Sequence, residues 1–81
     1  MLVSPAVQTP RPGGGYDTSY EAVRATLDAQ PWAGGTRRAQ AVLMPDDTAW
    51  NSASTRHVLH GPATVTWFEY PDGGIETVVN A

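Results

Sequence analysis

The sequence predicts an α+β domain in which one N-terminal amphipathic helix packs on a small, mostly antiparallel sheet of three to four strands. A capped stretch with helical apolar spacing lies early in the chain, and two strand-like segments joined by a glycine turn lie at its end. A segment rich in proline and glycine precedes both, and we expect residues 1–15 to form an extended arm. Residues 16–81 then form one small domain.

The helix follows directly after the arm. Thr18 and Glu21 have the spacing of a capping box, in which each side chain accepts a hydrogen bond from a free backbone N–H at the helix start. Tyr20, Val23 and Leu27 stand at positions i, i+3 and i+7 and therefore share one apolar face. Pro31 excludes the preceding residue from helical geometry, so the helix must end before it.

The middle of the chain predicts a strand, a loop and a second strand. Residues 36–44 predict a strand that becomes more apolar along its length and ends at Pro45. Residues 45–53 predict a loop that carries Trp50, and residues 55–60 predict a second strand, which the turn at Gly61-Pro62 ends. The alternative to both is a short helix that begins at Asp46 or Asp47 and stops at Gly61-Pro62.

The end of the chain predicts a β-hairpin. Residues 63–70 are rich in β-branched and aromatic side chains, residues 71–74 form a turn, and residues 75–79 form the second strand. We expect a register in which Tyr70 lies opposite Ile75. Period-two alternation then divides the side chains between two faces. The face expected in the core carries Thr66, Phe68, Tyr70, Ile75, Thr77 and Val79.

The same register has a consequence for charge. Glu69 would lie opposite Glu76 and beside Trp67 on the second face. Like charges directly opposite each other destabilise a hairpin, so either both are solvated or an arginine of a neighbouring strand lies between them. The other reading is an acidic, aromatic patch that receives a basic partner.

The composition argues against several kinds of site and binding partner. There is no cysteine, so neither a disulfide nor a cysteine-based zinc site is expected. The net charge is −3 and the one basic doublet is Arg37-Arg38, which argues against nucleic-acid binding. No stretch has the roughly 18 apolar residues of a membrane span, and the first residues do not resemble a secretory signal. We therefore expect that the chain binds neither nucleic acid nor a membrane, and that it is synthesised in the cytoplasm. The abundance of alanine, glycine, proline and arginine is typical of a high-G+C genome.

Catalytic and cofactor motifs are not evident. His57 and His60 would point to opposite faces of a strand, and no HExxH pattern accompanies them. Ser52, Ser54, His57 and Asp46 occur without a nucleophile elbow. We therefore expect a protein that is not an enzyme, with no cofactor and no metal.

The remaining expectation is binding to a protein partner or to further copies of the chain. An extended arm ahead of a compact body is a layout similar to that of small virion decoration and head-accessory proteins of tailed phages. That similarity implies a virion component that attaches through its arm. The alternative is a small intracellular inhibitor or regulator, such as a phage-encoded blocker of a host protein, that binds through the acidic, aromatic patch. The residues expected at the interface are Pro10, Arg11, Pro12, Trp50, Trp67, Glu69 and Glu76.

Overall fold

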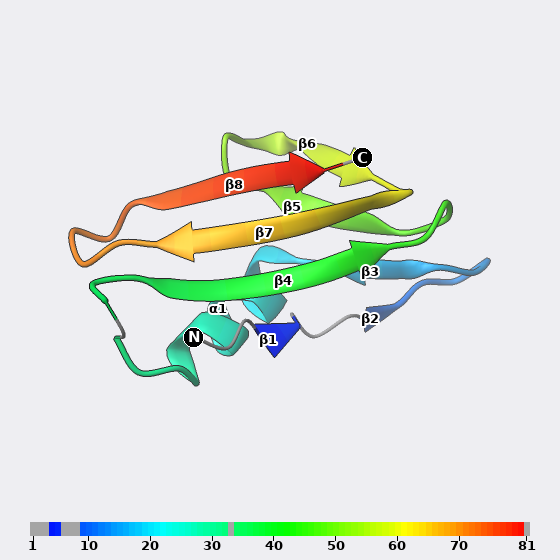
Figure 1. Cartoon of the computed structure of the whole chain (residues 1–81). Coiled ribbons are helices and arrows are strands. Elements are labelled where there is room, and N and C mark those ends of the chain that lie inside the picture. Colours follow the sequence, from blue (N-terminus) through cyan, green and yellow to red (C-terminus); the bar gives the residue numbers. More distant parts are fainter. Residues whose placement is uncertain (1–3, 6–8, 33, 81) are drawn as a thin grey trace.

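The computed structural model describes residues 4–5, 9–32 and 34–80, and these form one helix and two four-stranded sheets (Figure 1). The first sheet has the order β1-β4-β7-β8 and the second has the order β2-β3-β5-β6. Along the chain the elements are β1 (Ser4–Pro5), β2 (Thr9–Pro10), β3 (Tyr16–Thr18), α1 (Tyr20–Asp28), β4 (Arg37–Leu43), β5 (Thr48–Asn51), β6 (Ser54–His60), β7 (Ala63–Glu69) and β8 (Ile75–Asn80).

The α+β class with one helix and mostly antiparallel strands is confirmed, but a single sheet is wrong. In Figure 1, β4, β7 and β8 lie side by side in one layer, with β5 and β6 behind them. The second sheet arises because residues 48–51, expected as a loop or a short helix, form strand β5. This strand pairs in parallel with β3 and antiparallel with β6. The expected strand at residues 55–60 is confirmed as β6.

The N-terminal segment lies partly outside the described residues. Residues 1–3 and 6–8 are not described, so the expected extended arm stays a prediction there. Ser4 and Pro5 lie parallel to β4, and β2 forms an antiparallel pair with β3. Gly13, Gly14 and Gly15 turn the chain between β2 and β3 with φ values of 90°, 108° and 77°. These angles lie in the region that favours glycine, which explains the triplet at this turn.

Helix α1 forms where the sequence predicts it. The cap is Ser19, one residue after the expected Thr18, and its hydroxyl accepts a hydrogen bond from the Ala22 N–H at 3.2 Å. Val23 and Leu27 are fully buried, which confirms the predicted apolar face at these two positions, whereas its third residue, Tyr20, is exposed. Because α1 packs against β4, this face supplies one wall of the core.

Trp67 of β7 is the largest side chain of the core, and none of its surface is exposed. Its indole Nε1 donates a hydrogen bond to the Trp50 carbonyl at 3.3 Å, so it joins the two sheets as well as filling the interior. The buried cluster around it consists of Val23, Leu27, Ala39, Ala41, Leu43, Ala49 and Val65. Trp50, Leu59 and Ile75 pack against this cluster and are half-buried.

The C-terminal hairpin is present, but the predicted register is wrong by one residue. Ile75 lies opposite Glu69, and Thr77 lies opposite Trp67. Tyr70 belongs to the connecting loop, where its N–H donates to the Gly74 carbonyl at 2.9 Å. Because side chains alternate with period two, this shift reverses the face of every β7 residue relative to the prediction.

The reversed face changes the composition of the core. Val65 and Trp67 point inward, whereas the expected core residues Phe68 and Tyr70 are half-buried and exposed, and Thr66 is buried on the outer side. On β8, Ile75 and Thr77 are half-buried on the predicted face, and Val79 of the same face is exposed. Glu69 is therefore on the core side, and Glu76, opposite Phe68, is on the outer side.

Asp47 holds the connection between β4 and β5. Its Oδ1 accepts a hydrogen bond from the Tyr16 N–H at 2.9 Å, and its Oδ2 accepts one from the Met44 N–H at 2.8 Å. Its own carbonyl accepts from the Gly61 N–H at 3.0 Å. The buried carboxylate therefore fixes the start of β3 and the end of β4, and the backbone carbonyl of the same residue fixes the turn before β7.

Candidate interaction surface

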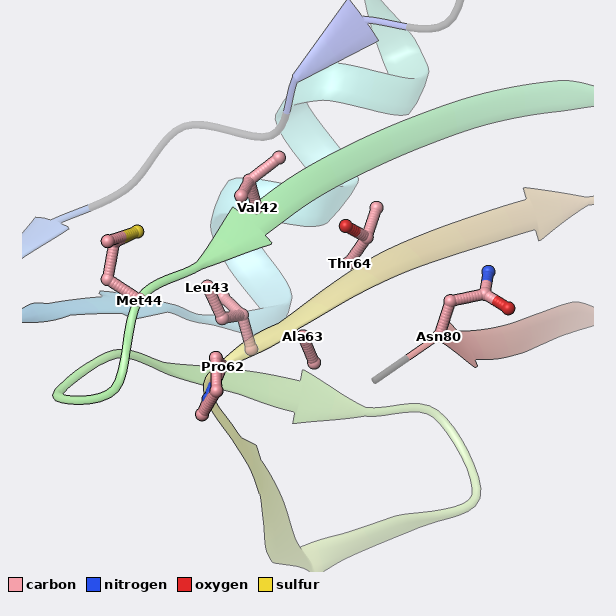
Figure 2. Close-up of a pocket in the computed structure, with 7 residues that line it drawn as sticks. All are labelled: Val42, Leu43, Met44, Pro62, Ala63, Thr64 and Asn80. Carbon is pink, nitrogen blue, oxygen red and sulfur yellow. The ribbon is translucent and has the colours of Figure 1, made fainter.

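An open, mostly apolar depression lies at the end of the first sheet, where β4 ends and β7 begins. Its volume is about 380 Å³. Figure 2 shows the residues that line it, from the ends of three neighbouring strands and the turn before β7. These residues are Val42, Leu43, Met44, Pro62, Ala63, Thr64 and Asn80. Only Thr64 and Asn80 among them carry polar side chains. A lining of this kind suits apolar contacts with a bound group.

Two of these side chains are unusually exposed for apolar residues. Val42 is 61% exposed and Met44 is 62% exposed. Ala39, Ala41 and Leu43 point into the core, so the alternation of β4 directs Val42 outward. The sequence contains this signal, because the outward positions change from polar Gln40 to apolar Val42. Neither residue is among those expected at an interface from the sequence.

The turn before β7, which contributes Pro62 to the lining of the depression, requires glycine at position 61. A Cβ atom at Gly61 would overlap the carbonyl oxygen of Met44. Only glycine lets the two backbones approach this closely, and the approach places Pro62 beside Met44. Hydrogen bonds from the Met44 and Gly61 N–H groups to Asp47 hold these two segments together beside the depression.

A charged cluster lies at the opposite end of β4 and β7. Glu69 is 4% exposed, and its Oε1 accepts hydrogen bonds from Arg24 at 2.6 Å and from Arg37 at 3.1 Å. Arg24 also bonds Asp28 within the helix at 2.9 Å. The Arg37 guanidinium lies 3.9 Å from the ring centre of Trp32, which is a cation–π geometry.

These contacts change the ionisation of Glu69. The hydrogen bond from Arg24 is the main cause that lowers the pKa of Glu69, and the charges of Arg24 and Arg37 act in the same direction. Burial acts against them, because it disfavours the charged carboxylate. The same pairing raises the pKa of Arg24. The cluster is internally satisfied and joins α1 to β4 and β7.

The structure does not bring the expected acidic, aromatic patch together. Trp67 and Glu69 are buried on the core side, and Glu76 is exposed on the outer side. The Glu76 carboxylate accepts a hydrogen bond from the Tyr70 hydroxyl at 2.8 Å. The expected opposition of Glu69 and Glu76 is wrong, because Glu69 lies opposite Ile75. An arginine of a neighbouring strand does lie beside Glu69, since Arg37 of β4 forms an ion pair with it.

The three expected interface residues of the arm lie at the first hairpin. Pro10 is in β2 opposite Tyr16, and Pro12 is exposed in the turn that follows. Arg11 is half-buried, and its N–H donates to the Gly15 carbonyl at 3.1 Å. Its guanidinium donates to the Asp46 carbonyl, so this arginine holds the hairpin against the connection between β4 and β5.

Trp50 is not a free anchor on a loop. It lies in β5 opposite Val58, is half-buried against the core, and meets the Tyr20 ring edge-on with ring centres 4.9 Å apart. This position differs from the expected one because β5 is held by strands distant in sequence, and the local polar composition does not reveal them.

We expect Trp50→Ala to lower the free energy of unfolding by about 2 kcal/mol, from lost apolar burial and the lost aromatic pair. Trp32→Ala is the matched control. Trp32 is 48% exposed, so its loss should cost less than about 1 kcal/mol. Urea denaturation of both variants measures the difference. Equal losses would contradict the packing of Trp50 against Tyr20 and the core.

The two histidines stand apart from any ligand set. His57 and His60 are both exposed on β6. Within the described ranges, no group of three or more histidine, aspartate or glutamate side chains has metal-binding geometry. No described helix has the length and apolar character to span a bilayer.

Comparisons with protein-family models, curated proteins and solved structures give no match to this chain.

Proposed function

We propose that this chain is a non-enzymatic protein–protein interaction module, and that the depression at the end of the first sheet is a contact surface. The observation that supports this most strongly is the exposure of Val42 and Met44, each above 60%, beside an apolar hollow. Exposed apolar surface next to a concave site is typical of protein contacts, where a partner side chain fills the hollow.

Within this class we propose a small virion accessory or decoration-type subunit that attaches through its N-terminal segment. The support is the plan of the chain: a proline- and glycine-rich segment precedes a body held by its own core. The alternative function, a small inhibitor of a host protein, required that Trp67, Glu69 and Glu76 form one exposed patch. Because Trp67 and Glu69 are buried, no observation favours that reading.

Replacing Met44 with aspartate tests the contact surface. The tagged chain is expressed in its source cells, and bound proteins are quantified by mass spectrometry after crosslinking. We expect Met44→Asp to reduce recovery of a stoichiometric partner at least tenfold, because a charge would be buried without a counterion in the contact. Val58→Asp is the control, since Val58 is an exposed aliphatic residue on β6.

Both variants must melt within a few degrees of the unmodified chain for the comparison to hold. Equal loss of the partner in both variants, or no loss in either, would contradict the assigned surface. Deletion of residues 1–8 tests the arm separately. If the arm carries attachment, the deletion should abolish co-sedimentation of the chain with particles of capsid size.

A further inference from the structure

We infer that β8 pairs with β8 of a second copy of this chain, antiparallel and across a two-fold axis, so that the two first sheets become one continuous sheet. β8 is the outer strand of that sheet in Figure 1. This self-association goes beyond the proposed function. It uses the edge of the sheet and not the depression, and it holds whether or not the depression binds another protein.

The four outer strands of the described sheets differ in how their edges are protected. β1 contains Pro5 and β2 contains Pro10, and proline has no N–H to offer to a further strand. β6 carries Arg56 and two histidines, and its ladder with β5 has a register shift. Proline, charge and bulges are the usual means of preventing edge-to-edge pairing. β8 has none of these except the single charge of Glu76.

The backbone of β8 presents alternate groups to its free edge. The bond from the Tyr70 N–H to the Gly74 carbonyl begins the ladder, and the register from there to Asn80 has no shift. Hydrogen-bonded and non-hydrogen-bonded pairs alternate in an antiparallel ladder. The N–H and C=O groups of Ile75, Thr77 and Val79 therefore point away from β7. No described strand pairs with that side of β8.

Two-fold symmetry restricts the pairing. Opposed residues of an antiparallel pair share a face, and a two-fold axis normal to the sheet keeps inner faces together. Pairing about Thr77 satisfies both conditions and uses all three outward residues. Ile75 then faces the partner's Val79, and Thr77 faces the partner's Thr77. Each of these pairs exchanges two backbone hydrogen bonds.

The side chains of β8 suit pairing with themselves. Ile75 and the partner's Val79 are β-branched and would contact across the strands, which is a favourable cross-strand pair. Glu76 would face the partner's Val78, so the two carboxylates would not oppose each other. A register shifted by two residues in one direction would leave Ile75 without a described counterpart. Shifted in the other direction, it would place Glu76 opposite the partner's Glu76, which is unfavourable. One strand edge is a small interface, so we expect a reversible dimer whose population depends on concentration.

The first test is sedimentation velocity of the full chain over a range of concentrations. We expect the mass to rise from that of the 8.6 kDa chain toward twice that value. Val79→Pro removes an N–H that only the partner would accept, so it should weaken dimerisation at least tenfold while β7 pairing persists. Val79→Thr retains the N–H and β-branching and is the control. A chain that stays monomeric at all concentrations overturns the inference.

The second test does not require the chain to fold with a proline in β8. The chain has no cysteine, so Glu76→Cys and Val78→Cys can be introduced singly. In the proposed register these positions form a non-hydrogen-bonded pair with Cα atoms roughly 4.5 Å apart, within disulfide range. A mixture of the two variants should form disulfide-linked dimers at least fivefold more readily than either variant alone. Equal yields in all three samples would overturn the proposed pairing.

Discussion

Trp67→Ala should lower the free energy of unfolding by about 4 kcal/mol, within the range for truncation of a fully buried aromatic residue. Trp67 has no exposed surface and packs among small β4 residues, Ala39 and Ala41, which cannot fill the resulting cavity. The hydrogen bond from its indole to the Trp50 carbonyl would also be lost. A body of this size has a total stability of roughly 3–5 kcal/mol, so we expect a largely unfolded chain.

Phe68→Ala is the matched control for this result. Phe68 is the next residue of β7, is half-buried, and points to the outer face, where the Arg38 guanidinium lies 5.5 Å from its ring centre. Its truncation should cost about 1–2 kcal/mol. Urea denaturation followed by far-ultraviolet circular dichroism compares the two variants. A larger loss from Phe68→Ala than from Trp67→Ala would show that β7 presents its faces the other way.

Glu69→Gln should lower the free energy of unfolding by about 3 kcal/mol, because it leaves two arginines beside a buried neutral amide. Arg24 and Arg37 both donate to the same carboxylate oxygen. Glu76→Gln is the control, since Glu76 is exposed and bonds only the Tyr70 hydroxyl among the described groups. We expect the control to change stability by less than about 0.5 kcal/mol. Similar losses in the two variants would contradict the structural role of Glu69.

The effect of Glu69 should depend on pH. Its folded-state pKa is lowered, chiefly by the hydrogen bond from Arg24, so the folded chain binds a proton less readily than the unfolded chain. The stabilisation is therefore present above the unfolded pKa of about 4.3 and is lost as the pH falls through the folded pKa. Urea midpoints at pH 6 and pH 3 should show the stability gap between the unmodified chain and Glu69→Gln shrinking in acid. A constant gap would contradict this linkage.

The sequence predicts those elements whose signals are local. Helix α1 follows from a polar cap, apolar spacing and Pro31, and each of these signals acts on residues close to it in the sequence. The strands of the C-terminal hairpin follow from β-branched and aromatic composition in the same way. The cap at Ser19 and not at Thr18 is a difference of one residue, because both side chains can accept the same kind of bond.

The register of the hairpin could not be read locally. The prediction ended the first strand at Tyr70, but the loop holds Tyr70 because the Asp72 carboxylate accepts the Gly74 N–H at 2.8 Å and tightens the turn. Alternation gives two candidate faces and does not say which faces inward. A loop longer by one residue therefore exchanged Phe68 for Trp67 in the core and moved Glu69 from the surface to the interior.

Strand β5 and the candidate surface depend on contacts distant in sequence. Residues 48–51 have weak strand composition, and they are held by β3, β6 and the hydrogen bonds of Asp47. Val42 and Met44 could have been selected from the alternation of β4. Their place beside Pro62 could not, because it follows from the close approach of Gly61 to Met44.

The parallel pairing of β3 with β5 also sets an order of events during synthesis. Asp17 lies opposite Thr48, 31 positions further along the chain, and the Thr48 hydroxyl donates to the Asp17 carboxylate at 3.2 Å. The glycine hairpin of β2 and β3 therefore leaves the ribosome well before the strand that completes its sheet. Closing such long loops before any contact forms is slow. The hairpin of β2 and β3 can therefore join the second sheet only after the residues of β5 have been synthesised.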